Sequence, residues 1–189
     1  MSQRIGLFGG SFDPFHLGHF LVARTSVELF RLQKVVFLPC AQSPLKKGRP
    51  VAGDQTRLNM LREGLRGQSW AQVSDWEIRR GGVSYTIDTV HAWQGNNPKS
   101  SLYWIMGSDQ WLQLPSWKEP QELARSLRFL VFPRPERPRS RRGFRMREIP
   151  FRIDLSATEV RERIRKKLPI QGLVLPAVEG LIRRKGWYR

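Results

Sequence analysis

Two histidines directly after a glycine-rich strand end are the residues best suited to chemistry. The chain reads Gly9-Gly10-Ser11-Phe12-Asp13-Pro14-Phe15-His16-Leu17-Gly18-His19, and a helical pattern begins near its end. Glycine lets a ligand approach the backbone closely, and imidazoles near a helix N-terminus place donors at an anion site. The paired glycines alone are equally typical of a plain turn. Together with the two histidines they favour a phosphate site, in which Gly18 leaves room for a nucleobase or phosphate.

A second anion-binding pattern lies far away, in Ser156-Ala157-Thr158-Glu159-Val160-Arg161. Ser156 and Glu159 have the spacing of a capping box, which opens a helix. The free N–H groups of such a helix start, the hydroxyls of Ser156 and Thr158, and Arg161 could together hold the phosphates of a nucleotide. An ordinary capped surface helix is the alternative interpretation of this motif by itself.

Alternating strand and helix patterns predict the scaffold for these residues. We expect an α/β fold with a Rossmann-like, doubly wound, mostly parallel sheet, in one domain over 1–189 whose helical C-terminal part covers about 154–189. The expected strands are 4–9, 34–39, 72–78, 101–107, 127–132 and 149–153. The expected helices are 18–31, 54–66, 86–94, 120–126, 156–167 and 177–185. Two segments interrupt this pattern and could be mobile: the loop 40–53, and the arginine- and proline-rich segment 133–148, which has too few apolar residues to pack.

Composition narrows the function class. Lys and Arg number 33 against 16 Asp and Glu, a formal charge of +17, and much of the excess lies in 134–152 and 161–189. Such a charge attracts phosphates, whether through a solvated basic surface, a field that steers substrates, or a nucleic-acid face. The single cysteine, Cys40, cannot form an internal disulfide. Without a membrane-length apolar run or a signal-peptide core, the chain is expected to be cytoplasmic and to need no membrane.

The two motifs, in this order, resemble the nucleotidyltransferase superfamily of adenylyltransferases. Within it, three further segments resemble bacterial nicotinate mononucleotide adenylyltransferases: Ser84-Tyr85-Thr86-Ile87-Asp88-Thr89; Met106-Gly107-Ser108-Asp109 with Trp117; and Gly186-Trp187-Tyr188-Arg189. The resemblance runs nearly end to end. It implies transfer of AMP from ATP to nicotinate mononucleotide, giving nicotinate adenine dinucleotide and pyrophosphate in NAD biosynthesis. It also implies Mg²⁺, carried by ATP with few or no protein ligands.

The chemistry suits these residues, because an attacking phosphate is already anionic near pH 7 and needs no general base. Positioning and charge neutralisation then carry the catalysis. We assign catalysis to His16 at the α-phosphate, with His19 and Arg161 on the triphosphate. The expected ATP-binding set adds residues of both motifs and of the strand end at 107: Gly9, Gly10, Ser11, Phe12, Gly18, Gly107, Asp109, Ser156 and Thr158.

The expected acceptor site comprises Lys46, Tyr85, Thr86, Asp109 and Trp117. A helix starting at Tyr85-Thr86 points N–H groups at a carboxylate, which predicts a preference for nicotinate over nicotinamide. Tyr85 and Trp117 offer faces for the pyridinium ring, although core packing explains Trp117 equally well. Asp109 is expected to orient a ribose hydroxyl or a basic partner, with a helix N-cap as the alternative.

Lys46 is the expected counter-charge for the mononucleotide phosphate. Family members often carry Pro-His-Lys in this loop, whereas this chain has Pro44-Leu45-Lys46-Lys47, so the histidine is absent and Lys47 competes for the role. A solvated loop lysine is the alternative.

Two other functions are weighed. A phosphopantetheine adenylyltransferase would share both ATP motifs but lacks the Ser-Tyr-Thr element and the tryptophan. A nucleic-acid-binding module would use the +17 charge, but the arginines of 134–147 lie between prolines and no RNA-binding signature accompanies them. Nucleic acid is therefore an unlikely main partner, and a homo-oligomer stays open.

Overall fold

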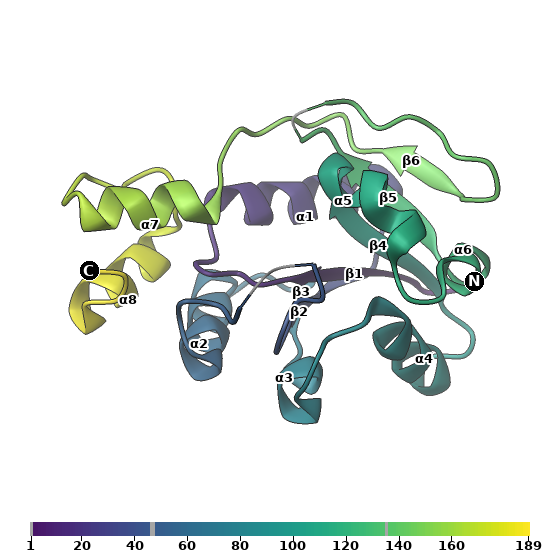
Figure 1. Ribbon diagram of the computed structural model, residues 1–189, viewed down its shortest axis with the longest axis horizontal. Coiled ribbons are helices and arrows are strands. Elements are labelled where there is room, and N and C mark those ends of the chain that lie inside the picture. Colours follow the sequence, from purple (N-terminus) through teal and green to yellow (C-terminus); the bar gives the residue numbers. More distant parts are fainter. Residues whose placement is uncertain (1, 46–47, 135) are drawn as a thin grey trace.

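The computed structural model describes residues 2–45, 48–134 and 136–189 (Figure 1). Its parallel strands form one sheet in the order β3-β2-β1-β4-β5-β6. The strands are β1 (Arg4–Gly10), β2 (Lys34–Pro39), β3 (Ala71–Val73), β4 (Ser101–Gly107), β5 (Arg128–Phe132) and β6 (Met146–Glu148). This confirms the predicted Rossmann-like α/β fold.

Helices cover both faces of the sheet. They are α1 (Leu17–Phe30), α2 (Asp54–Gly64), α3 (Trp76–Arg80), α4 (Thr86–Asn96), α5 (Ser108–Gln113), the 3-10 turn η1 (Leu114–Ser116), α6 (Pro120–Ser126), α7 (Ala157–Arg165) and α8 (Pro176–Lys185). Side chains of α1, α2 and α8 share one core with one sheet face, and those of α4, α5 and α6 pack on the other. Alternate residues of a strand serve the two cores, because successive side chains point to opposite faces.

The strand order reverses between β1 and β4, and this places the candidate site. Chain-order neighbours β1, β2 and β3 run one way across the sheet, while β4, β5 and β6 continue from β1 the other way. Ligands in open α/β sheets bind outside the carboxyl ends of the strands at such a point. Here those ends are Gly10 and Gly107.

Two predicted strands are wrong in position. The expected strand 72–78 stops at Val73, and Trp76–Arg80 forms α3, which an Arg79–Asp75 ion pair of 2.9 Å supports across one turn. Trp76 and Ile78 are apolar residues two positions apart, which is the spacing expected of a strand with one buried face. The expected strand 149–153 lies after β6, whose residues 146–148 pair with β5. Pro150 has no N–H to donate to a ladder.

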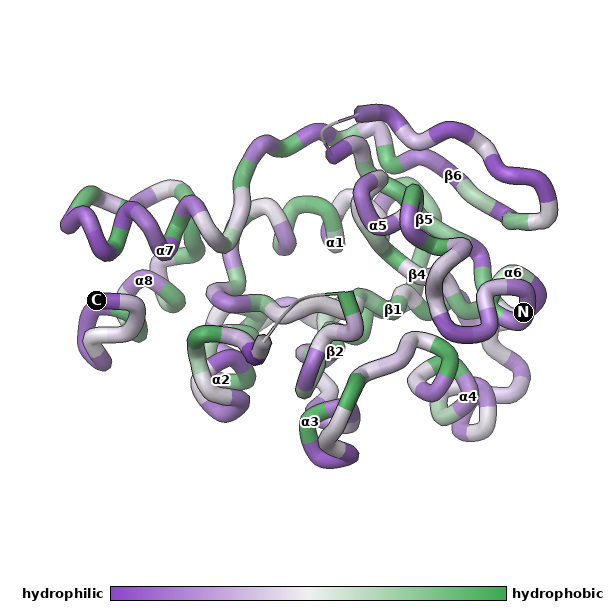
Figure 2. The backbone as a smooth tube through the Cα atoms, in the orientation of Figure 1, coloured by the Kyte–Doolittle hydropathy of each residue, from purple (hydrophilic) through white to green (hydrophobic). Residues whose placement is uncertain are grey.

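The arginine-rich segment between β5 and β6 packs on the protein, contrary to expectation. Figure 2 shows how hydrophilic this stretch is. The buried Ser108 hydroxyl accepts from the Arg134 N–H at 2.7 Å, and the Trp111 indole donates to the Arg139 carbonyl at 2.9 Å. Phe144 also packs edge-on against Trp111. Backbone groups and one aromatic side chain supply the packing that the scarce apolar residues do not.

Helices α7 and α8 lie together at one end of the molecule, far from β6, with the C-terminus beside them (Figure 1). Within the described ranges, no helix has the length and apolar character needed to cross a bilayer.

Candidate active site

The signature segment, residues 9–19, joins β1 to α1 at the carboxyl edge of the sheet. Strand β1 continues through Gly10, so the two glycines end the strand, and the turn falls on Phe12, which has a left-handed φ of 48°. A Cβ on Gly9 would lie 2.8 Å from the Trp104 ring. Glycine is therefore required at position 9 for packing, and Gly9, Gly10 and Ser11 line a cavity described below.

The two histidines stack on each other at the start of α1. Their ring centroids are 3.6 Å apart, and Phe15 stacks with His19 at 5.9 Å. The backbone N–H of His16, the N-cap residue, donates to Nδ1 of His19 at 3.3 Å, which leaves the hydrogen of a neutral His19 on Nε2. This confirms the prediction that both imidazoles face the same side.

His16 is buried and neutral. It is 4% exposed, and burial, followed by the charge of Arg134, lowers the pKa of His16 to about 3. Its Nδ1 has no hydrogen-bond partner among the described residues. A Cβ on Gly18 would come within 3.0 Å of that same Nδ1, so the space over Gly18 is filled by the His16 ring. This differs from the expected room for a nucleobase or phosphate.

Arg161 connects the two predicted motifs. Ser156 caps α7, with its hydroxyl accepting from the Glu159 N–H at 3.1 Å, as predicted. One turn on, Arg161 donates both within its own helix and beyond it: Nη2 donates to the Thr158 hydroxyl at 3.1 Å, and Nη1 donates to the Asp13 carbonyl at 2.5 Å. A guanidinium 148 residues away thus lies against the signature segment, with its Nε unpartnered within the described ranges.

Asp13 holds the surroundings of this contact together. Its buried carboxylate accepts from the N–H of Val51 at 2.7 Å, the N–H of Ala52 at 3.1 Å, and the Tyr188 hydroxyl at 2.7 Å. Burial and then the Asp13 charge raise the pKa of Tyr188, so its hydroxyl stays a donor. Sequence reasoning assigned Asp13 only to a rigid turn, and no local signal indicates partners from positions 51, 52 and 188.

Arg57 is a second residue that sequence reasoning missed. It is fully buried on α2, where it donates to the carbonyls of Ser11 at 2.9 Å and Cys40 at 2.7 Å and pairs with Asp54 at 2.6 Å. It therefore ties the loops after β1 and β2 to each other. An arginine in a helix pattern is normally read as solvent-exposed, so only its position opposite two loop ends reveals this role.

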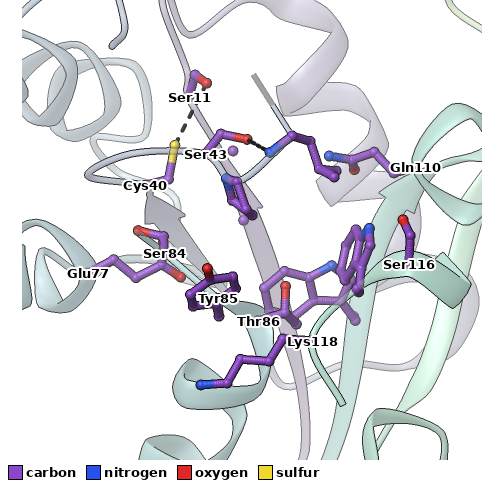
Figure 3. A pocket seen from close by; sticks show the side chains of 16 residues that line it. Ser11, Cys40, Ser43, Glu77, Ser84, Tyr85, Thr86, Gln110, Ser116 and Lys118 are labelled. Carbon is purple, nitrogen blue, oxygen red and sulfur yellow. Dashed lines mark hydrogen bonds between the residues drawn. The ribbon is translucent and has the colours of Figure 1, made fainter. Parts of the chain in front are cut away.

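The acceptor cavity, as we call it, has a volume of about 190 Å³ beside the signature segment (Figure 3). It takes in Tyr85, Thr86 and Trp117 of the predicted acceptor residues. Its other lining residues are Gly9, Gly10, Ser11, Cys40, Ser43, Pro44, Leu45, Glu77, Ser84, Trp104, Gln110, Ser116 and Lys118. The structure thus gathers the glycine strand end and the Ser-Tyr-Thr element around one space.

The acceptor cavity is lined by aromatic rings and by one acidic and one basic side chain, Glu77 and Lys118. Helix α4 begins at Thr86 with Tyr85 as N-cap, as predicted. The Lys118 ammonium lies 5.0 Å from the Tyr85 ring centroid and 3.1 Å from Asp88, so the protein supplies its own cation to the Tyr85 ring. Trp117 meets Trp104 edge-on at 6.4 Å, and its buried Nε1 has no partner within the described ranges.

Two predicted positions, Gly107 and Asp109, lie at the end of β4. Gly107 is the N-cap of α5, where a Cβ would collide with Asp109 Oδ1. That oxygen is buried without a partner in the described part of the chain, so Asp109 retains an acceptor for a ligand. The N-cap alternative for Asp109 is wrong. Lys46, with its competitor Lys47, lies outside the described residues.

Comparison with known proteins agrees with this geometry. The Cytidylyltransferase-like family model matches residues 7–163. A "Probable nicotinate-nucleotide adenylyltransferase" of Methylacidiphilum infernorum is 39% identical, and the alignment covers 99% of this chain and 93% of that protein. A protein of the same name from Opitutus terrae is 37% identical, and the alignment covers 99% of this chain and 98% of that protein. The Plasmodium falciparum nicotinic acid mononucleotide adenylyltransferase complexed with NaAD has the same fold, with a TM-score of 0.83, 21% identity, and 98% and 97% of the two chains covered. This chain belongs to the nicotinate-nucleotide adenylyltransferase family.

Proposed function

We propose that this protein transfers the adenylyl group of ATP to nicotinate mononucleotide in the cytoplasm. A phosphate oxygen of the mononucleotide bonds to the α-phosphorus of ATP, the bond from that phosphorus to the β-bridging oxygen breaks, and pyrophosphate leaves. One observation carries the proposal: Arg161 of α7 meets the signature segment at Asp13, beside the stacked His16 and His19. This contact brings α7 against the signature segment, whose Gly9, Gly10 and Ser11 line the acceptor cavity.

His16 is suited to stabilise the α-phosphate as a neutral donor. With a pKa of about 3 it carries no charge near pH 7 in the free protein, and its buried ring has an unpartnered Nδ1. No proton has to be removed from an anionic phosphate, so the ring's function is to hydrogen bond to charge that develops on oxygen. Burial strengthens that bond, because little water competes with it.

The remaining ATP contacts are assigned to residues of both motifs and of the end of β4. Arg161 is held by Thr158 and the Asp13 carbonyl and still has an unpartnered Nε, so it can add a charge-assisted bond to the β- or γ-phosphate. His19 would hold the same phosphates, and the N-terminal N–H groups of α7, with Ser156 and Thr158, would receive the outgoing pyrophosphate. Gly10, Ser11 and Phe12 would lie along the nucleotide, with Asp109 on its ribose.

On the acceptor side, the first N–H groups of α4 lack intrahelical partners and would meet the nicotinate carboxylate. They would accept an amide less favourably, because its NH₂ is itself a donor. Tyr85 and Trp117 would flank the pyridine ring, while Lys46 would meet the mononucleotide phosphate.

Mg²⁺ is expected to arrive with ATP, where it would neutralise charge on the phosphate oxygens. The Asp13 carboxylate, although it lies in the signature segment, is already satisfied by three donors. Within the described ranges, no three His, Cys, Asp or Glu side chains gather as a metal site. We therefore assign the Asp13 carboxylate to holding residues 51, 52 and 188, and expect ATP to carry the cation.

Pyrophosphate release with three acceptors tests the proposal. Nicotinate mononucleotide should turn over best, ahead of nicotinamide mononucleotide and phosphopantetheine. Dominance of either competitor would overturn the acceptor, and retention on heparin without any ATP turnover would favour a nucleic-acid-binding protein.

A variant tests the ATP side separately. His16→Ala should lower turnover at least about a hundredfold while its circular dichroism and melting curve stay those of a folded protein. Near wild-type turnover would remove His16 from the mechanism.

A further inference from the structure

A buried carboxylate on the wall of the acceptor cavity has no part in the reaction described above. Glu77 lies on α3, is 3% exposed and lines the cavity. Its Oε1 accepts from the hydroxyl of Thr89 at 2.7 Å, and Thr89 is fully buried on α4. A carboxylate is rarely buried to this degree without a specific partner, so this contact holds α3 and α4 in one arrangement.

Ser84 extends this contact to the loop after β2. Its hydroxyl accepts from the Ala41 N–H at 3.0 Å, and its own N–H donates to the Gln42 carbonyl at 2.8 Å. Figure 3 shows Glu77 and Ser84 on the same wall of the cavity, next to Tyr85. Three chain segments that line the acceptor cavity are therefore joined around Glu77: the loop after β2, the turn at 84–85 and helix α4.

The surroundings of Glu77 are arranged for a carboxylate. Burial raises its pKa, while hydrogen bonds from the Thr89 and Ser84 hydroxyls and the charges of Arg80 and Arg57 oppose that rise. Two hydroxyl donors and the positive charges of two arginines therefore favour the ionised form of this carboxyl group. A group of this kind orients its donors, because removing the carboxylate leaves the Thr89 and Ser84 hydroxyls without this charged acceptor.

We propose that Glu77 is a positioning residue for the acceptor: through Thr89 and Ser84 it sets where α4 begins on the cavity wall. This inference rests on the proposed function. The N–H groups of the first turn of α4 discriminate acid from amide only while they point into the cavity, and displacements of about 1 Å weaken such contacts strongly. The hydrogen bonds described for Glu77 run to the 84–89 segment, so ATP binding should not depend on it.

Steady-state pyrophosphate release, with each substrate varied in turn, tests the inference. Glu77→Gln and Thr89→Val should raise KM for nicotinate mononucleotide about tenfold, with KM for ATP and kcat within about twofold of wild type. Thr89→Ser keeps the hydroxyl and should restore the wild-type KM. The ratio of kcat/KM for the acid over nicotinamide mononucleotide should fall about threefold or more. Glu28→Gln, an exposed acid paired with Arg24 on α1, is the matched control and should change nothing.

Each result decides between explanations. A role in stability alone would lower the melting temperature of both variants and leave KM for the acceptor at the wild-type value, which overturns the inference. A parallel rise in KM for ATP overturns it as well. If Glu77→Gln does not fold, the Thr89→Val and Thr89→Ser pair decides alone. Wild-type protein is assayed first: no turnover of nicotinate mononucleotide refutes the proposed function, whereas normal wild-type turnover with unmoved variants refutes only the role of Glu77.

Discussion

Removing one hydroxyl near the C-terminus should destabilise the protein by an amount that the structure allows us to work out. Tyr188 is 9% exposed, and its hydroxyl donates to the buried Asp13 carboxylate at 2.7 Å. A hydrogen bond to a charged group contributes about 1.5–3 kcal/mol. In Tyr188→Phe the carboxylate keeps its two backbone donors, Val51 and Ala52, so we expect a loss near the lower end, about 1.5–2 kcal/mol.

Urea unfolding measures this loss directly. The midpoint should fall with an unchanged m-value, and the melting temperature should drop by roughly 3–8 °C, given about 2–4 °C per kcal/mol for a chain of this size. Tyr103→Phe is the matched control: Tyr103 has similar burial on β4 and no carboxylate partner in the described part of the chain, so it should cost less than about 0.5 kcal/mol.

A double-mutant cycle with Asp13→Asn identifies the partner. The two substitutions should couple by about 1 kcal/mol or more, because they remove the same hydrogen bond. Additive effects, or a Tyr188→Phe variant as stable as wild type, would refute the reasoning that Asp13 anchors the C-terminus.

Three further predictions concern buried groups. The pKa of His16 is about 3 in the folded protein and about 6.5 in the unfolded chain, so as the pH falls the unfolded chain binds the proton first. Between pH 7 and pH 5 the free energy of unfolding should therefore fall by about 2 kcal/mol more for wild type than for His16→Gln, measured by urea unfolding at each pH. Arg57→Lys should destabilise the protein by about 2 kcal/mol or more, because an ammonium cannot reach the three acceptors that the planar guanidinium reaches. Asp54→Asn changes a half-exposed partner and should cost less than about 1 kcal/mol. Equal losses of stability would contradict this ranking. Ser108→Ala should leave the Arg134 N–H with only its longer bond to the Glu136 carbonyl, at 3.2 Å, cost about 1 kcal/mol and speed tryptic cleavage in 137–142. An unchanged cleavage rate would show that the segment is held by other contacts.

The elements that the sequence predicted correctly are buried central strands and helices with a clear starting motif. Strands β1, β2 and β4 are continuous apolar runs, and α1 and α7 begin at recognisable anion-site or capping patterns, so their predicted bounds were correct within two residues. The failures were short elements. In α3, five residues with Trp76 and Ile78 two apart have too little length to show a helical period.

The candidate site divides in the same way. Groups that act within one short motif, such as His16 with His19 or Ser156 with Glu159, can be found from spacing, because the partners lie within one helical turn. Contacts that bring distant segments together cannot. The local motif singled out Arg161, but its bond to the Asp13 carbonyl depends on how α7 docks after the whole sheet has formed, so the motif does not reveal that contact.

One arginine of the basic surplus, Arg134, acts on a residue of the candidate site. Arg134 belongs to the arginine- and proline-rich segment, and Ser108 at the end of β4 fixes its backbone. Its charge adds to burial in lowering the pKa of His16, so this segment helps to keep the ring neutral. The same positive potential attracts a polyphosphate, and attraction between charges near a protein surface weakens as salt screens it. The placement of Arg134 therefore helps to keep His16 neutral and adds positive potential around it, and both effects suit the role at the α-phosphate that we propose for His16.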